Sequence, residues 1–208
     1  MLFWRVICRN EDNPATSDIE QAILDVATAI GGRMMVCLRR MGSCSRRREP
    51  WKPLNDAGIT TLAQVSGASR QQLLEQFKRP DSRSVLLGTR SFWEGVDGLL
   101  CAAVLITKLP FDVPSDPIFA ARAETFENSF FQYSIPEAVL RFRQGFGHLI
   151  RRQVDEGVVA ILDKRVLTKR YGRLFLEALP ECMVLRQRTD RLGELTLRWL
   201  NRDKARRS

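Results

Sequence analysis

The chain has 208 residues, which is enough for one large domain or one and a half small ones but excludes a large multidomain enzyme within this sequence. Hydrophobic residues make up 44% and charged residues 27%, close to the average of globular proteins, so we expect a folded core rather than disorder. The 33 Lys and Arg against 24 Asp and Glu give a net charge of +9. This charge fits a polyanionic partner such as nucleic acid, although a solvated basic surface would give the same value.

The sequence predicts neither a membrane span nor a metal site. The longest apolar run, Leu99–Ile106, is much shorter than the roughly 18 residues of a membrane span, and Arg5 interrupts the apolar start before a signal peptide can form. We therefore expect a cytosolic protein with no membrane partner. The cysteines have neither a C-x-x-C pair nor the spacing of zinc or iron–sulfur ligands, which predicts scattered reduced thiols: Cys8, Cys37, Cys44, Cys101 and Cys182.

The predicted elements alternate between helices and short buried strands. The first helix spans Asp18–Ile30, with Ser17 as N-cap, Glu20 completing a capping box, and Gly31-Gly32 ending it. Short apolar runs suit strands covered on both faces, at Met34–Leu38, Thr61–Val65, Val85–Leu87, Ala103–Ile106, Val158–Leu162 and Met183–Leu185. Further helices are predicted at Ser69–Phe77, Pro117–Phe126, Pro136–Arg152 and Leu167–Leu179. This alternation predicts an α/β fold with a parallel sheet flanked by helices.

We divide the chain into an N-terminal segment (1–17), an α/β lobe (18–187) and a basic C-terminal helix or tail (188–208). The arginine-rich stretch Arg39–Pro53 fits neither a strand nor a good helix. We interpret the basic clusters at 46–48 and 204–207 as solvated charge, with DNA contacts as the alternative. The helix predicted at Pro136–Arg152 has an apolar stripe formed by Val139, Leu140, Phe142, Phe146, Leu149 and Ile150. Its remaining face is basic, with Arg141, Arg143, Arg151 and Arg152.

The segment Leu86–Asp97, LLGTRSFWEGVD, gathers polar residues where a buried strand ends. Ligands of open α/β sheets bind at the carboxyl ends of strands, and Gly95 would let the backbone approach one closely. A plain strand-to-helix turn with Ser91 as N-cap would explain the same pattern. The polar residues and the glycine are Thr89, Ser91, Glu94, Gly95 and Asp97.

The segment Arg141–Arg152, RFRQGFGHLIRR, places Gln144, His148 and Arg151 on one helix face. An arginine held there could reach a phosphate across a cleft, while a solvated basic helix face is the alternative. Gly145 and Gly147 each cost roughly 1 kcal/mol inside a helix. We therefore expect either close packing at these glycines or a helix start near Gly147.

These two segments belong to a longer series of strings that resembles a known family. GTRSFWEGVD, TKLPFDVPSDP, RFRQGFGHLIRRQVDEGVVAILDKR and TKRYG, in this order, resemble the C-terminal motor lobe of DinG-type helicases, relatives of the XPD group in superfamily 2. The resemblance covers roughly Asp18–Leu185. It implies a RecA-like lobe, ATP hydrolysis coupled to movement along single-stranded DNA, and nucleotide bound in the cleft between two lobes.

The resemblance also implies roles for individual residues. GTRSFWEGVD matches motif V, which implies that Glu94, Gly95 and Asp97 bind ATP and that Thr89, Arg90, Ser91 and Trp93 contact DNA. QGFGHLIR matches motif VI, which implies that Gln144 and Arg151 are catalytic and that Gly147 and His148 also line the ATP site. Trp93 and the neighbouring Phe92 could stack on bases, or both could belong to the core.

The sequence departs from the family in ways that affect function. It contains no G-x-x-x-x-G-K-[ST] loop, so we expect the chain alone not to hydrolyse ATP, with ATP and Mg held mainly by a first lobe on another chain or a missing gene segment. In the family the iron–sulfur cysteines also belong to that first lobe, which predicts no cluster in this chain. His148 stands where motif VI normally has arginine, and a neutral imidazole loses both a fixed charge and a bidentate fork.

Two further departures suggest changes at the gene level. CLRRMGSC stands where the family has a Phe-Thr-Ser-Tyr-like motif after its strand, and a neighbouring reading frame with suitable codons would read Phe-Ala-Thr-Tyr-Gly-Gln-Leu over Leu38–Cys44. We therefore hypothesise a frameshift within Val36–Pro53, which the nucleotide sequence of the gene tests. A Val-Pro-Gly-like insert is also absent after Asp97.

The sequence therefore predicts the second RecA-like lobe of a DinG-type DNA helicase, either truncated or incomplete. A non-enzymatic nucleic-acid-binding or regulatory lobe that has lost the motor function is the alternative. A third hypothesis is an unstable fragment with an exposed apolar cleft face, which a cooperative melt of a monodisperse sample would exclude.

Overall fold

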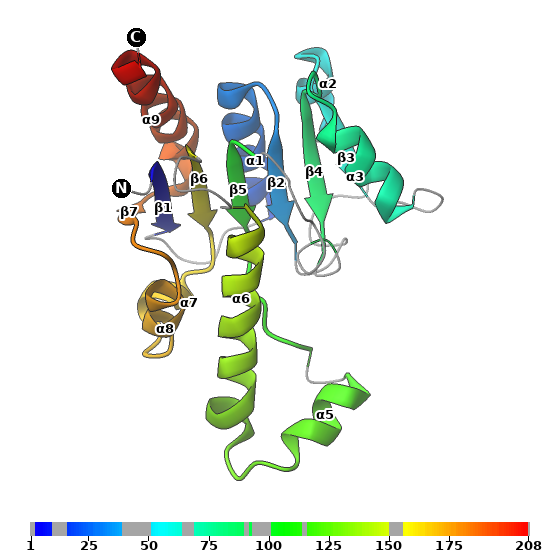
Figure 1. The fold of residues 1–208 in the computed structure, drawn as a ribbon, viewed down its shortest axis with the longest axis vertical. Coiled ribbons are helices and arrows are strands. Elements are labelled where there is room, and N and C mark those ends of the chain that lie inside the picture. Colours follow the sequence, from blue (N-terminus) through cyan, green and yellow to red (C-terminus); the bar gives the residue numbers. More distant parts are fainter. Residues whose placement is uncertain are drawn as a thin grey trace.

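The computed structural model describes residues 3–9, 16–38, 51–63, 69–89, 92, 101–113, 116–149 and 156–207 (Figure 1). Within these residues, seven parallel strands form one sheet in the order β3-β4-β2-β5-β6-β1-β7. The strands are β1 (Phe3–Arg9), β2 (Met34–Cys37), β3 (Thr60–Ala63), β4 (Ser84–Gly88), β5 (Ala103–Ile106), β6 (Glu156–Ile161) and β7 (Met183–Gln187). The predicted parallel α/β fold is confirmed.

Helices cover both faces of the sheet. They are α1 (Thr16–Ile30), α2 (Lys52–Asp56), α3 (Arg70–Lys78), α5 (Pro117–Ala123), α6 (Ile135–Leu149), α7 (Arg165–Thr168), α8 (Gly172–Glu177) and α9 (Leu192–Arg207). A short π-helix, η3 (Phe130–Ser134), leads into α6, and a 3-10 turn, η4 (Thr189–Arg191), leads into α9. None of these helices is long and apolar enough to cross a membrane.

Every residue of β2, β4 and β5 is buried, because alternate side chains enter two separate cores. Met34 and Val36 pack with α1, α2 and α9 on one face. Met35 and Cys37 pack with α3, α6 and α8 on the other face. This double burial explains why the strands are continuous apolar runs.

Helix α1 lies between the sheet and solvent and buries Ile19, Ile23 and Val26. It begins at Thr16, so the prediction of Ser17 as N-cap was wrong, because Ser17 is already helical. Gly31 and Gly32 end the helix as predicted, with positive φ angles of 71° and 96°.

The segment predicted as one helix over 167–179 forms α7 and α8 instead. The chain turns between them, and the amide of Gly172 donates to the carbonyl of Lys169 at 2.8 Å. A Cβ at Gly172 would lie 2.3 Å from the carbonyl oxygen of Val166, so only glycine fits this close approach. The break is therefore a feature of the packing of α8 against α7.

The sheet includes one strand that was not among the predicted elements. Strand β1 lies between β6 and β7, with Val6 opposite Val159 on one side and Val184 on the other. Its two partners come from the last third of the chain, so no local pattern announces the pairing. Helix α9 occupies most of the segment for which the sequence predicted a helix or a tail. Gly193 lets this helix pack closely on α1, because a Cβ there would lie 3.0 Å from the Cβ of Asp25.

Candidate functional site

The carboxyl ends of three neighbouring strands, β4, β2 and β5, form one edge of the lobe. The amide of Leu38, just after β2, donates to the carbonyl of Gly88 at the end of β4 at 2.8 Å. Thr107, just after β5, donates from both its amide and its hydroxyl to the carbonyl of Cys37, at 3.1 and 3.0 Å. These bonds continue the sheet past its last paired residues and fix where the following loops begin.

Thr89, the first residue of the motif V segment outside β4, is half-buried at this edge. The amide of Phe92 donates to the carbonyl of Thr89 at 2.9 Å, which turns the chain back over the sheet. Phe92 is fully buried, and a Cβ on Gly88 would lie 2.7 Å from its Cβ. Gly88 is therefore required for Phe92 to enter the core.

Burial of Phe92 decides between the two interpretations of this aromatic residue. Its ring lies in the core, with the guanidinium carbon of Arg70 at 5.9 Å from the ring centroid, so it cannot stack on a nucleic-acid base. The other predicted motif V residues lie outside the described residues: Arg90, Ser91, Trp93, Glu94, Gly95 and Asp97.

Helix α6 carries the motif VI segment up to Leu149 as one continuous helix through both glycines. Phe142, Gly145 and Phe146 face the core, which turns Gln144 outward and leaves it exposed. Gly145 is buried, and because the helix continues to Leu149 the predicted helix start near Gly147 is wrong. The backbone of Gly147 and His148 lies in the last turn of α6, whereas Arg151 lies outside the described residues.

The predicted apolar stripe and basic face of α6 need correction. Leu140, predicted in the stripe, is 48% exposed, while Phe142 and Phe146 are buried as expected. Arg141 is not a solvated cation, because it forms ion pairs with the buried Asp112 and, at 3.2 Å, with Glu137. The first pair ties α6 to the segment that follows β5.

A buried carboxylate that was not among the predicted site residues anchors the end of β6. Asp163 accepts hydrogen bonds from the amide of Leu109 at 2.9 Å and from the Nη2 of Arg165 at 2.6 Å. Burial by itself would raise the pKa of Asp163, but the hydrogen bonds from Arg165 and Leu109 outweigh it and hold that pKa below its ordinary value. An acidic residue directly after a fully apolar strand is the sequence signal that could have revealed this anchor.

The buried thiols in the described residues are core groups. Burial raises the pKa of Cys37 far above its usual range and that of Cys101 to about 12, so both thiols are neutral at physiological pH. Within the part of the chain that the structure describes, no three His, Cys, Asp or Glu side chains come close enough together to hold a metal ion.

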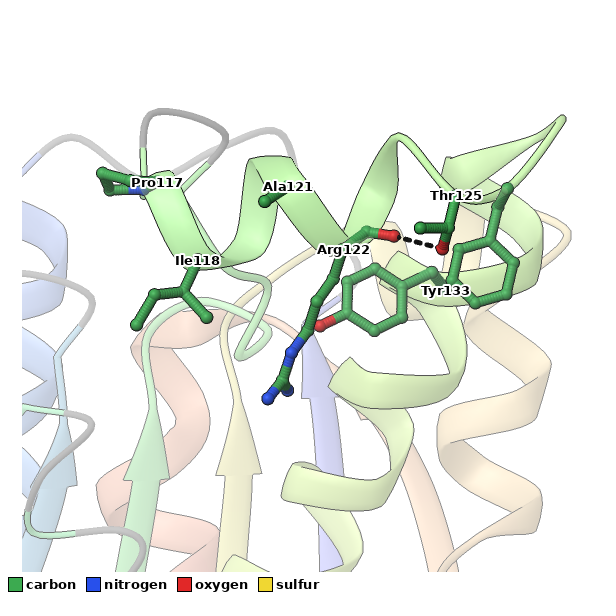
Figure 2. A pocket seen from close by; sticks show the side chains of 7 residues that line it. Pro117, Ile118, Ala121, Arg122, Thr125 and Tyr133 are labelled. Atoms are coloured by element: carbon green, nitrogen blue, oxygen red, sulfur yellow. Dashed lines mark hydrogen bonds between the residues drawn. The ribbon is translucent and has the colours of Figure 1, made fainter.

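A cavity of about 680 Å³ lies between α5 and η3, at the far end of the projection formed by these elements and the first turns of α6 (Figures 1 and 2). Figure 2 shows the side chains of Arg122 and Tyr133 among those that line it, and the Thr125 hydroxyl donates to the Arg122 carbonyl at 2.8 Å. Most of the lining is apolar, including Ile118, which is 68% exposed. The cavity contains none of the predicted site residues, so it is separate from the candidate site.

Comparisons with known proteins identify the family. The model of the helicase C-terminal domain matches residues 23–182. The ATP-dependent DNA helicase YoaA of Haemophilus influenzae is 46% identical over 177 residues, covering 82% of this chain and 27% of the relative. The 3'-5' exonuclease DinG of Bacillus subtilis is 46% identical over 138 residues, covering 63% of this chain and 15% of the relative.

Solved structures agree on the architecture. The C-terminal domain of the DEAD-box protein Dbp5 superposes with a TM-score of 0.55 at 12% identity, covering 97% of both chains. Domain 2 of the DEAD-box helicase Mss116p, solved with an RNA duplex, superposes with a TM-score of 0.52 at 13% identity, covering 94% of this chain and 70% of that one. At this identity the likeness shows the RecA-like fold alone. The chain spans about a quarter or less of the length of these two sequence relatives. Because the family model matches most of the chain and the fold agrees, the chain belongs to the helicase C-terminal domain family as a DinG-type lobe.

Proposed function

We propose that this chain works as the C-terminal motor lobe of an ATP-dependent DNA helicase. The observation that carries the proposal is the arrangement of the two motif segments on one rigid lobe. Motif V leaves the carboxyl end of β4, and motif VI lies on α6, whose Phe142 and Phe146 are anchored in the same core as β4. We propose that such a lobe contacts nucleotide through residues of both segments and nucleic acid through motif V.

The proposed site divides into a nucleotide part and a nucleic-acid part. The nucleotide part contains Gln144, Gly147 and His148 on α6, together with Arg151 and the motif V residues Glu94, Gly95 and Asp97. The nucleic-acid part contains Thr89, Arg90, Ser91 and Trp93, which we propose contact single-stranded DNA. We assign the first lobe, with its phosphate-binding loop and Mg, to a separate chain or segment, because this sequence contains no such loop.

In this proposal the lobe contributes charge and position to the reaction. The burial of Phe142 and Phe146 holds α6 against the sheet, so Gln144 is presented to solvent from a rigid helix. The guanidinium of Arg151 would stabilise negative charge on the transferred phosphoryl group, an effect worth about 10³ to 10⁵ in rate when an arginine is supplied across a cleft. His148 in place of arginine removes one charged contact, so we expect weaker catalysis than a lobe with arginine there would give.

The test combines this chain with a first lobe that carries a G-x-x-x-x-G-K-[ST] loop and measures ATP hydrolysis with and without single-stranded DNA. We expect DNA-stimulated hydrolysis that Arg151→Ala abolishes and His148→Arg increases. Arg191→Ala is the matched control, because Arg191 is an exposed arginine paired only with Glu194 among the described contacts, and its loss should leave the rate unchanged. No hydrolysis above that of the first lobe alone would contradict the motor function and leave a non-enzymatic nucleic-acid-binding lobe.

The predicted cytosolic location remains a prediction. Fractionation of cells that express the full chain, with detection of the protein in the soluble or the membrane fraction, tests it directly.

A further inference from the structure

The segment that runs through α7 and the following turn into α8 is basic. Its residues 164–173, KRVLTKRYGR, contain five Lys or Arg and no carboxylate. The turn itself is formed by residues 169–171. Arg165 is bound to Asp163, and Arg173 forms an exposed pair with Glu177 at 2.5 Å. Lys169 and Arg170 are both exposed, and among the described residues neither has an ion-pair partner. These two cations are therefore available to an external anion.

The backbone that carries Lys169 and Arg170 is held in one shape. The amide of Lys169 donates to the carbonyl of Arg165 at 3.1 Å, and the amide of Gly172 donates back to Lys169 at 2.8 Å. Tyr171, between them, packs edge-on against Phe111 with ring centroids 5.6 Å apart. Because the turn is already ordered, a ligand bound to these side chains costs less conformational entropy than one bound to a flexible basic tail.

The turn lies on the same side of the sheet as motif V. Helix α7 follows the carboxyl end of β6 after Leu162 and Asp163, and Figure 1 shows α7 and α8 beyond the strand ends, on the side of the sheet to which β4 also points. Strands β2 and β5 separate β4 from β6, which corresponds to about 14 Å at the usual strand spacing. A single strand that contacts Thr89 at the end of β4 can therefore run along this edge toward Lys169 and Arg170.

We propose that Lys169 and Arg170 bind the phosphodiester backbone of single-stranded nucleic acid and extend the interface from motif V across the edge of the sheet. The proposal rests on the nucleic-acid part of the proposed function. Two exposed cations on a rigid turn suit phosphates spaced along a strand, because backbone contacts need charge and register but no enclosed pocket. Such contacts position the strand and read no sequence.

The test measures binding of a fluorescent dT20 oligonucleotide to the full chain by anisotropy at several salt concentrations. In Lys169→Ala/Arg170→Ala we expect the slope of log K against log salt to flatten by about 1.4, because each contact to a single-strand phosphate contributes about 0.7. If the two contacts contribute nothing at 1 M salt, this difference in slope corresponds to about 25-fold weaker binding of the variant than of the parent at 0.1 M salt. The double variant Lys169→Gln/Arg170→Gln, which retains longer side chains, should show the same flattening of the slope. Both double variants should melt within a few degrees of the parent.

The matched control is Lys78→Ala/Arg79→Ala, which removes the same charge from two adjacent exposed cations at the end of α3. This helix runs away from the carboxyl edge, so the control should retain the parental slope apart from a small effect of net charge. Equal flattening in the control, or an unchanged slope in both Lys169/Arg170 variants, would overturn the proposal while leaving the function at motif V intact. Failure of the parent chain to bind dT20 at 50 mM salt would instead overturn the nucleic-acid part of the proposed function together with this extension.

Discussion

Asp163→Asn tests whether the end of β6 depends on a buried charge. Asp163 is fully buried, and its two carboxylate oxygens accept from the amides of Leu109 and Arg165 and from the guanidinium of Arg165. Asparagine has one acceptor oxygen, and its NH2 group must face one of these donors. The substitution therefore both removes an ion pair and leaves a buried N–H group without an acceptor.

The expected loss follows from these contacts. Removing one partner of a buried ion pair costs about 3–5 kcal/mol of stability. Because the Arg165 side chain is 33% exposed, water can solvate its unpaired guanidinium, so we expect a loss of about 3 kcal/mol. For a domain of this size that loss lowers the melting temperature by about 6–12 °C. Thermal unfolding followed by circular dichroism at pH 7 measures it. Asp190→Asn is the control, because its pair with Arg188 is exposed and worth about 0–1 kcal/mol.

The pH dependence gives a second readout of the same anchor. The pKa of Asp163 in the folded chain lies below its unfolded value of about 3.9, so its stabilisation is complete above pH 4 and is lost as the pH falls through the folded pKa. The difference in stability between the parent and Asp163→Asn should therefore be constant from pH 5 to 8 and shrink in more acidic solution. A loss at pH 7 no larger than that of the control, or a difference that grows on acidification, would refute the reasoning.

Two further predictions concern the packing described above. Gly172→Ala should lower the free energy of unfolding by about 1–3 kcal/mol in a urea titration, because the new methyl group would meet the carbonyl oxygen of Val166 at 2.3 Å. The same substitution at an unconstrained helical site would raise stability by about 1 kcal/mol. A gain would therefore show that the turn relaxes freely. In iodoacetamide labelling at pH 8, peptide mass spectrometry should find the half-buried Cys182 modified well before Cys37 and Cys101, and all three modified alike in urea. Early labelling of Cys101 in the native chain would contradict the burial that raises its pKa.

The local pattern was sufficient for most of the sheet and for the position of the motifs in it. Continuous apolar runs predict strands buried on both faces, and Met34–Leu38 and Ala103–Ile106 match β2 and β5 within a residue. The resemblance of the motif V and motif VI strings, in their order along the chain, to a known family predicted a helicase lobe, and the family model confirms it. The site residues themselves stay predictions, since most of them lie outside the described residues.

Other features depend on partners that are remote in the sequence. Strand β1 pairs with β6 and β7, and Phe92 turns inward because Gly88 leaves room for its side chain. The carboxylate of Asp163 accepts a hydrogen bond from the amide of Leu109. Periodicity reports only which side chains share a face of one element, so it cannot show which element covers that face. The sequence alone determined most of the elements and the family of this lobe. Tertiary packing decided the place of β1, which polar groups are buried and paired, and which, such as Lys169, remain exposed to solvent.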